Sequence, residues 1–199
     1  MIEKLKGHIP DFILAQLQLC ADKYGINNPL RMAHFLGTCA EETGNFTVFE
    51  ENLNYSAERM HAVWPGEFPT IESAKPYEYQ PEKLANFIYA GKIGNTLPDS
   101  GWKWRGRGPI QLTGYNNYLA FSNFVHNAEI LVNPDLINTR YQMESAAYFW
   151  DSKKLNDVAE GGISDGIIHV IAGKVNGNPN GNFDARKAET LKFYNLLNS

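Results

Sequence analysis

The segment from Asn28 to Gly44 constrains the fold of this chain most. Between these two residues the sequence is apolar at nearly every position of a helix, and a helix that is apolar all round is normally buried. Asn28 followed by Pro29 is a typical helix start, and Gly44 is a typical helix end. The sequence therefore predicts a central helix that reaches Thr43, around which the rest of the domain must pack.

The rest of the chain carries further helix signals and almost no strand signals. Its caps and breakers predict helices after Pro10 until Gly25, from Ser56 to Trp64, from Pro81 to Ala90, from a Thr113 cap through Phe121, from a Thr139–Gln142 capping box to Trp150, from Ser164 to Ile171 and from Phe183 to Leu197. The expected fold class is mainly α. The 199 residues suit one domain over 1–199, since single domains commonly run about 100 to 200 residues.

Composition excludes several classes of protein. The net charge is −4 without a block of Lys or Arg, so we expect no nucleic-acid partner. No run approaches the roughly 20 apolar residues that span a bilayer, so no membrane insertion is expected. The first residues, Met1–Pro10, lack the pattern of a signal peptide. We therefore expect synthesis in the cytoplasm and any export by another route.

The histidines and cysteines point to neither a metal site nor a covalent nucleophile. No H-E-x-x-H or G-x-S-x-G pattern occurs, and we expect no metal and no catalytic triad. Cys20 and Cys39 are too few for a disulfide scaffold and both lie in apolar helical patterns. They are predicted to be buried, reduced thiols.

Two groups of acids flank a predicted turn. Glu41 and Glu42 end the central helix, where burial and the helix dipole disfavour a charged carboxylate and suit a general acid. Glu51 follows Gly44 and an apolar pair, Val48-Phe49, that is expected to pin the turn to the core. Most glutamates are simply solvated, but a carboxyl pair in different environments suits hydrolysis of a glycosidic bond. Glu42 and Glu51 are the candidates.

A second dense stretch runs from Trp104 to Tyr118. The glycines of Gly106-Arg107-Gly108 let a backbone approach another group closely, and Gln111, Thr113 and Asn117 suit recognition of hydroxyl and N-acetyl groups. The alternative is a glycine-rich loop whose polar residues only cap the next helix, and both interpretations stay open here.

Two other polar segments are predicted to be loops. Residues 91–108 form a long loop, which inside a compact domain is more often functional than not. Residues Lys174–Gly181 form a shorter polar loop, for which a simple turn is the default interpretation.

Five stretches occur in order along most of the chain: Phe35–Gly44, Glu51–Ser56, Gly106–Gly114 with Asn117-Tyr118, Asn133–Leu136 and Lys174–Gly177. Together they resemble family 19 glycoside hydrolases, particularly the phage and prophage endolysins of that chitinase-like group. The resemblance implies a lysozyme-like, two-lobed α domain with a substrate cleft, and no cofactor. It also implies Glu42 as general acid, Glu51 as general base and Thr113 as a residue that positions water. The expected substrate-binding residues are Tyr55, Gln111, Asn117, Asn176 and Arg186.

The chain departs from the family pattern at three places. The family often has His immediately before the acid, where this chain has Glu41. Asn45 stands where the usual pattern has a second glycine, and Glu50 competes with Glu51 for the role of base. Glu51 is preferred because it directly precedes Asn-Leu-Asn-Tyr.

These features predict an endolysin-type enzyme that cuts β-1,4 links between amino sugars of bacterial peptidoglycan with inversion at the anomeric carbon. Its expected partners are glycan strands, and it is expected to be a monomer that acts on the cell wall after release. One alternative is a chitinase acting on poly-GlcNAc. Another is a sugar-binding module without catalytic activity.

Overall fold

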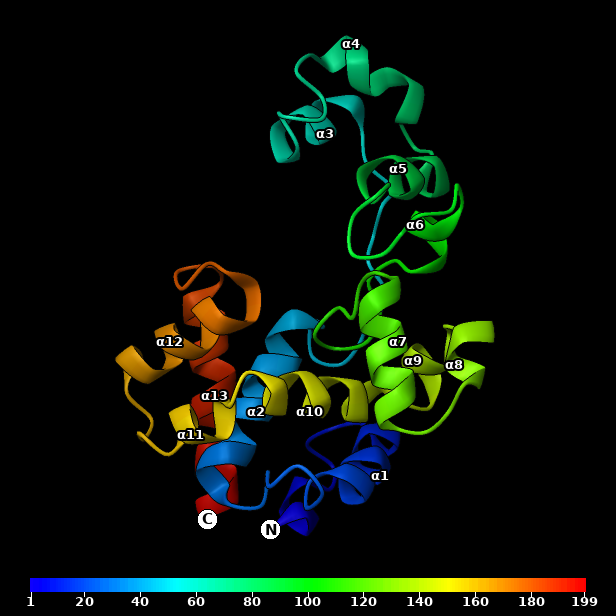
Figure 1. Ribbon diagram of the computed structural model, residues 1–199. Coiled ribbons are helices and arrows are strands. Elements are labelled where there is room, and N and C mark those ends of the chain that lie inside the picture. Colours follow the sequence, from blue (N-terminus) through cyan, green and yellow to red (C-terminus); the bar gives the residue numbers. More distant parts are fainter. The chain divides into compact units, whose positions relative to one another are not determined.

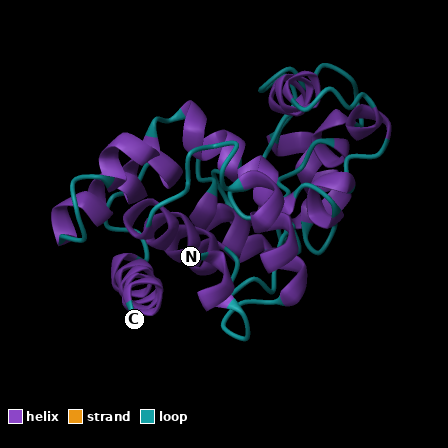
Figure 2. Ribbon diagram, turned by 90° about the horizontal axis from the view of Figure 1, so that it is seen from below, coloured by secondary structure: helices purple, strands orange, loops and turns teal.

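The computed structural model describes residues 1–199. Its regular structure is helical, with helices joined by loops throughout (Figures 1 and 2). The only β-type pairings are isolated bridges, among them Glu50 with Arg107 and Arg107 with Leu112. The prediction of a mainly α fold is confirmed.

The chain divides into two compact units. Unit 1 comprises Met1–Phe49, Gly108–Ile110 and Ile137–Ser199, and unit 2 comprises Glu50–Arg107 and Gln111–Leu136. The expectation of a single catalytic domain over 1–199 stays a prediction.

The helices of unit 1 are η1 (Ile2–Leu5), α1 (Asp11–Cys20), α2 (Pro29–Glu42), α10 (Gln142–Ser152), α11 (Leu155–Ala159), α12 (Asp165–Asn176) and α13 (Phe183–Asn198), and those of unit 2 are α3 (Ala57–Val63), α4 (Ile71–Ala74), η2 (Lys75–Tyr77), α5 (Pro81–Ile88), α6 (Ser100–Lys103), α7 (Tyr115–Phe124) and α8 (Glu129–Val132). The short helix α9 (Leu136–Thr139) begins at the last residue of unit 2.

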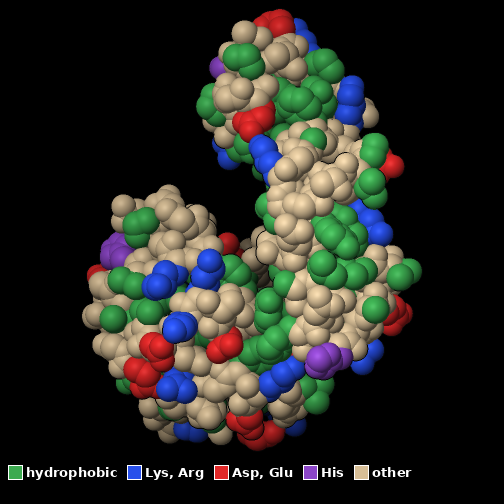
Figure 3. All heavy atoms as spheres, in the orientation of Figure 1, with side chains coloured by type: hydrophobic (Ala, Val, Ile, Leu, Met, Phe, Trp, Pro, Cys, Tyr) green, Lys and Arg blue, Asp and Glu red, His purple; other side chains and the backbone are tan.

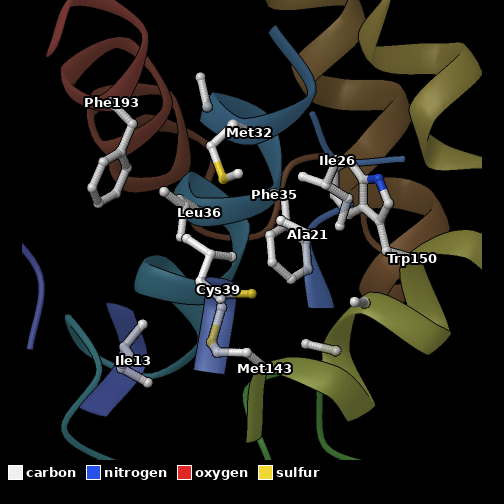
Figure 4. Close-up of a cluster of buried hydrophobic side chains, with 14 of the residues drawn as sticks. Ile13, Ala21, Ile26, Met32, Phe35, Leu36, Cys39, Met143, Trp150 and Phe193 are labelled. Atoms are coloured by element: carbon white, nitrogen blue, oxygen red, sulfur yellow. The ribbon is translucent and has the colours of Figure 1, made fainter. Parts of the chain in front are cut away.

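Helix α2 is the core of unit 1, as its sequence predicts. The Asn28 side chain caps it by accepting a hydrogen bond from the backbone of Arg31, and every residue from Met32 to Ala40 is buried. Figure 4 shows side chains of this core. The rings of Phe35 and Trp150 pack edge to face, with their centroids 5.5 Å apart. The packing around α2 fixes where its last turn lies.

Helix α13 packs alongside α2 in unit 1 (Figure 1). The contact is close at Gly37, where an added Cβ would lie 2.7 Å from the Cα of Thr190. Glycine at this position lets the two backbones approach. The close contact brings the first turns of α13 next to the acidic end of α2.

A Schellman-type cap ends α2. The backbone N–H of Asn45 donates to the carbonyl of Ala40 at 2.7 Å, and Gly44 has a φ of +56°. The hydroxyl of Thr43 donates to the carbonyl of Cys39 at 2.6 Å. Glu41 and Glu42 therefore occupy the last turn of a tightly terminated helix.

Both cysteines are buried and unpaired, which confirms their interpretation as thiols. Figure 4 shows Cys39 within the core cluster. Burial raises the pKa of Cys20 to about 12, with a further contribution from Glu144, and burial also raises the pKa of Cys39. Neither thiol is poised to react at neutral pH.

Unit 2 has a core of its own, built from Leu53, Ala57, Met60, Phe68, Ala74, Leu84, Ala85 and Ile88. Helices α5 and α6 touch at Gly101, where an added Cβ would lie 2.7 Å from the carbonyl carbon of Ala85. This core includes three residues of α5, and Tyr89 at the end of that helix and Trp102 of α6 pack against it.

Two predicted caps are wrong. Thr113 does not cap α7, because Gly114, at a φ of +86°, is the N-cap residue and the Thr113 hydroxyl donates to the carbonyl of Gln111 at 2.9 Å. The capping box from Thr139 to Gln142 is absent, because Thr139 ends the separate helix α9. The Gln142 side chain is instead bonded to Gln16 at 2.9 Å.

Two loops also differ from expectation. Helix α12 continues through Asn176 and ends at Gly177, with a φ of +75°, so the loop is shorter than Lys174–Gly181. Val48 does not anchor the turn after α2, since it is 54% exposed. Phe46 does so instead, buried against the ring of Phe193 with centroids 6.5 Å apart. Phe49 packs partly buried against the same core.

On the face that Figure 3 shows, acidic and basic side chains are interspersed in both units. Neither positive nor negative charge forms a continuous patch there. None of the helices combines the length and the apolar character needed to cross a bilayer.

Candidate active site

Unit 1 carries a cluster of two acids and one arginine. Glu41 and Glu42 lie in the last turn of α2, and Arg186 lies in the first turns of α13. The Nη2 atom of Arg186 is 2.5 Å from Oε2 of Glu41 and 2.5 Å from Oε1 of Glu42. One guanidinium nitrogen thus donates to both carboxyl groups.

The two acids differ in exposure. The side chain of Glu41 is only 4% exposed, whereas that of Glu42 is 20% exposed. Asn182 donates from its side-chain amide to Oε1 of Glu41 at 2.8 Å. Burial and the neighbouring Glu42 raise the pKa of Glu41, while Arg186 and Asn182 oppose that shift. Of the two acids, Glu42 is the one that a substrate can reach more easily.

Unit 2 holds Glu51 between two donors. The phenol of Tyr89 donates to Oε1 of Glu51 at 2.6 Å, and the backbone N–H of Gly106 donates to Oε2 at 3.2 Å. The backbone N–H of Glu51 returns a bond to the carbonyl of Gly106 at 3.0 Å. Burial, and then the charge of Glu51, raise the pKa of Tyr89, so its phenol stays protonated and able to donate.

Gly106 also brings two predicted site residues to Glu51. A Cβ added to Gly106 would collide with Oε1 of Gln111 and lie 3.2 Å from Oγ1 of Thr113. Both side chains therefore lie against the glycine whose N–H holds Glu51. The structure gathers Glu51, Gln111 and Thr113 in one cluster of unit 2.

Glu50 has a different environment from Glu51. Its Oε1 accepts a hydrogen bond from Nε of Arg105 at 2.7 Å, and Arg105 also donates to the carbonyl of Trp102 at 3.0 Å. The Arg105 guanidinium lies over the ring of Trp102, 3.9 Å from its centroid. Glu50 is thus a partner in a structural ion pair, which separates it from Glu51.

Arg107 supports the same loop from inside unit 2. It is buried and donates to Asp135 at 2.8 Å, to the carbonyl of Lys103 at 2.9 Å and to the hydroxyl of Tyr118 at 3.0 Å. That hydroxyl donates to the carbonyl of Arg105 at 2.9 Å. Arg105, before Gly106, and Arg107, between Gly106 and Gly108, are therefore structural, a role that no sequence motif indicates.

The remaining candidates lie in both units. In unit 2, Asn117 is exposed on the first turn of α7 and donates to the carbonyl of Thr113 at 2.7 Å. Tyr55 is half-buried there, with its ring 5.1 Å from that of Trp64. In unit 1, Asn176 is exposed at the last residue of α12. Arg186 is buried under the two acids, and its direct contact with sugar stays a prediction.

Comparison with known proteins identifies the family. A protein of Haemophilus influenzae described as a glycosyl hydrolase family 19 domain-containing protein is 35% identical over 180 residues, which cover 87% of this chain and 86% of that protein. This chain belongs to glycoside hydrolase family 19. The family 19 chain is also 37% identical over 79 residues to Chitinase 8 of Oryza sativa subsp. japonica, a match that covers 36% of this chain and 30% of the rice protein. No family model matches the chain.

Membership in family 19 makes the protein a glycoside hydrolase of the chitinase-like kind. The resemblance seen in the ordered motifs is thereby confirmed at the level of the family.

Proposed function

We propose that this family 19 glycoside hydrolase cleaves β-1,4 links between amino sugars of bacterial peptidoglycan, with Glu42 as general acid and Glu51 as general base. The observation that carries the proposal is the contrast between the two carboxyls. Glu42 shares a buried arginine with a second acid, whereas Glu51 accepts hydrogen bonds from a phenol and a backbone N–H. An acid and a base in one reaction need such different environments.

In the proposed reaction Glu42 donates its proton to the glycosidic oxygen as the bond from that oxygen to the anomeric carbon breaks. Glu51 takes a proton from a water molecule, whose oxygen forms the new bond to the anomeric carbon. Glu42 is then ionised and Glu51 protonated. Exchange of protons with water restores both groups for the next turnover.

The two donors to Glu51 support its role as base. The Tyr89 phenol and the Gly106 N–H each engage one oxygen of the carboxylate, which fixes its orientation. A base held in one orientation acts on a water molecule in a defined position.

Thr113 is proposed to position that water. Its hydroxyl hydrogen is used by the carbonyl of Gln111 at 2.9 Å, so the oxygen offers a lone pair that accepts a hydrogen from water. The Thr113 side chain lies against Gly106, whose backbone N–H donates to Glu51.

The amide side chains are proposed to bind the glycan. Gln111 and Asn117 in unit 2 and Asn176 in unit 1 offer neutral donors and acceptors for hydroxyl and N-acetyl groups. Tyr55 offers an aromatic ring and a hydroxyl. Arg186, which contacts Glu42, is proposed to act on the sugar together with that acid.

The preference for peptidoglycan follows from the resemblance to endolysins and from a bacterial relative that matches 87% of the chain. The site of action in this proposal is the bacterial cell wall. Cleavage of poly-GlcNAc is the second candidate, favoured by the partial match to a rice chitinase.

Clearing of a suspension of purified peptidoglycan, run beside hydrolysis of a chitin oligomer, tests the proposal. We expect peptidoglycan to be the better substrate by kcat/KM, and the Glu42→Gln variant to lose activity on both. Activity on the chitin oligomer alone would assign the protein to the chitinases. Binding without cleavage of either glycan would identify a sugar-binding module instead.

A further inference from the structure

Arg186 is a buried, permanent cation. Its side chain is 1% exposed, and a guanidinium does not lose its proton in a protein. Its Nε and Nη1 atoms have no hydrogen-bond partner within the protein. Its ionic contacts are made by Nη2, with Glu41 and Glu42. A buried charge without a counter-ion is strongly unfavourable. At least one of these two acids must therefore stay ionised.

The requirement conflicts with the proposed role of Glu42. A general acid must hold a proton before it reacts, and a protonated Glu42 cannot balance the charge of Arg186. Glu41 is then the carboxylate that remains on the guanidinium. Two adjacent carboxyls also disfavour double ionisation, and the charge of Glu42 is one of the causes that raise the pKa of Glu41.

Burial and the neighbouring Glu42 raise the pKa of Glu41, but the Arg186 charge and the hydrogen bond from Asn182 favour its ionised form. The hydrogen bonds therefore indicate which acid carries the proton. Both oxygens of Glu41 accept from N–H donors, Oε1 from Asn182 at 2.8 Å and Oε2 from Arg186 at 2.5 Å. Glu42 accepts from one N–H donor, that of Arg186, at Oε1 alone, and its side chain also shares a hydrogen bond with that of Glu41. Glu42 is also the more exposed acid, at 20% against 4%.

We infer that Glu41 is the resident counter-ion of Arg186 and thereby leaves Glu42 free to hold the proton that it donates. The inference rests on the proposed function, in which Glu42 is the acid. Glu41 is a positioning residue in this account, because it acts through Arg186 and Glu42 and not on the glycan. Glu41 stands where the family often has His.

The groups that act on this pair come from two packed helices and the segment between α12 and α13. Glu41, Glu42 and the buried Cys39 thiol lie on α2, Arg186 lies on α13, and Asn182 precedes α13. The Cys39 thiol has a raised pKa and stays neutral. The charge balance therefore depends on Glu41, Glu42 and Arg186.

The Glu41→Gln variant removes the counter-ion while it keeps the shape of the side chain. Arg186 must then pair with an ionised Glu42, so the acid form of Glu42 is reached only at lower pH. We expect kcat at neutral pH to fall about 10- to 100-fold, a part of the contribution of general acid catalysis. The rate optimum should move about one pH unit or more toward acid, the usual effect of an adjacent opposite charge. KM should change little.

A comparison of leaving groups separates this role from a structural one. The nitrophenyl glycoside of a chitin trimer needs less protonation of its leaving group than a chitin tetramer does. The loss of kcat in Glu41→Gln should therefore be smaller on the nitrophenyl glycoside. A merely loosened site would lose activity equally on both.

Two further variants keep the inference testable if Glu41→Gln folds poorly. Glu41→Asp retains the negative charge and should keep the rate optimum near the wild-type pH. Asn182→Gly removes the donor to Glu41 and suits the φ of +51° at this exposed position, and it should lower kcat several-fold with KM unchanged. The matched control is Glu144→Gln, which breaks an ion pair with Lys23 elsewhere in unit 1 and should leave kcat and its pH profile unchanged.

The outcomes for this inference and for the proposed function are distinguishable. An active Glu42→Gln variant would overturn the proposed function. An inactive Glu42→Gln variant, together with a wild-type pH profile and kcat in Glu41→Gln, would overturn the counter-ion role alone. So would an acid shift of equal size in Glu41→Asp and Glu41→Gln.

Discussion

Tyr89 donates its phenol hydrogen to Oε1 of Glu51 across 2.6 Å. Tyr89 caps the C-terminal end of α5, whereas Glu51 lies 38 residues earlier in the chain. The bond therefore connects the carboxylate to the core of unit 2. The orientation of Glu51 therefore depends on Tyr89, a residue outside the five sequence motifs.

Replacement of Tyr89 by Phe should lower kcat with little change in KM. The ring keeps its packing, but the carboxylate loses one of its two donors. A hydrogen bond to a charged group contributes about 1.5 to 3 kcal/mol, and about 1.4 kcal/mol corresponds to a tenfold change in rate, so kcat should fall at least about tenfold. Tyr24→Phe, which removes a tyrosine hydroxyl from Glu144, is the control. Equal kinetics in the two variants would argue against the role of Tyr89.

Replacing the neighbouring acids Glu50 and Glu51 by Gln should affect different properties, stability for Glu50 and kcat for Glu51. Glu51→Gln should lower kcat by about 10² to 10⁴-fold, the usual range for a general base, and leave the melting temperature nearly unchanged. Glu50→Gln should lower the melting temperature, because Arg105 loses its shorter ion pair, the one with Glu50, and retain most activity. Thermal melts and kinetics of both variants check this, and the reverse pattern would reassign the base to Glu50.

Gly106→Ala should weaken oligosaccharide binding. The new Cβ would push Gln111 and Thr113 from their places beside Glu51, and one lost hydrogen bond costs about 0.5 to 1.5 kcal/mol. A calorimetric titration should show affinity reduced about 2- to 10-fold. Gly66→Ala, where an added Cβ meets nothing within 4 Å, should bind like the wild type. Unchanged affinity in Gly106→Ala would remove Gln111 from the binding site.

Acid should destabilise the protein through His34. Burial lowers the pKa of His34, and its ring shares a hydrogen bond with the carbonyl of Gly162 at 2.9 Å. The folded state keeps the ring neutral, while the unfolded chain takes up a proton near pH 6.5. The stability from this group is thus complete above about pH 6.5 and is lost as the pH falls below it.

The His34→Gln variant tests this assignment, because glutamine can donate to the same carbonyl but does not titrate. The difference in melting temperature between wild type and variant should shrink as the pH falls from 8 to 5. A constant difference over that range would show that His34 does not set the acid sensitivity.

The helix boundaries that depend on local signals could be predicted from the sequence. Asn28, Ser56 and Ser164 each cap the helix that follows, because a cap involves residues within one turn of each other. Thr113 and Thr139 carry the same chemistry but do not act as caps. Gly114 is the N-cap residue in place of Thr113, and Thr139 ends the short helix α9. The cap chemistry of the two threonines alone does not predict these differences.

The candidate site could be predicted only in part for a related reason. Glu42, Glu51 and Thr113 lie in motifs that can be read along the chain. The contact of Arg186 with Glu41 joins residues 145 positions apart, and the bond from Tyr89 to Glu51 depends on how α5 packs. Such partners are set by tertiary packing, so no pattern along the chain pairs them.

Stereochemistry is the most direct test of the paired acid and base. An inverting enzyme keeps its carboxyls wide enough apart for water to attack, whereas a nucleophile requires a separation of about 5 to 5.5 Å. Proton NMR of peptidoglycan fragments, recorded immediately after cleavage and before mutarotation, identifies the new reducing end. We expect the α-anomer from the wild type and no product from Glu42→Gln. An initial β-anomer, or a glycosyl group trapped covalently on Glu51, would contradict this expectation.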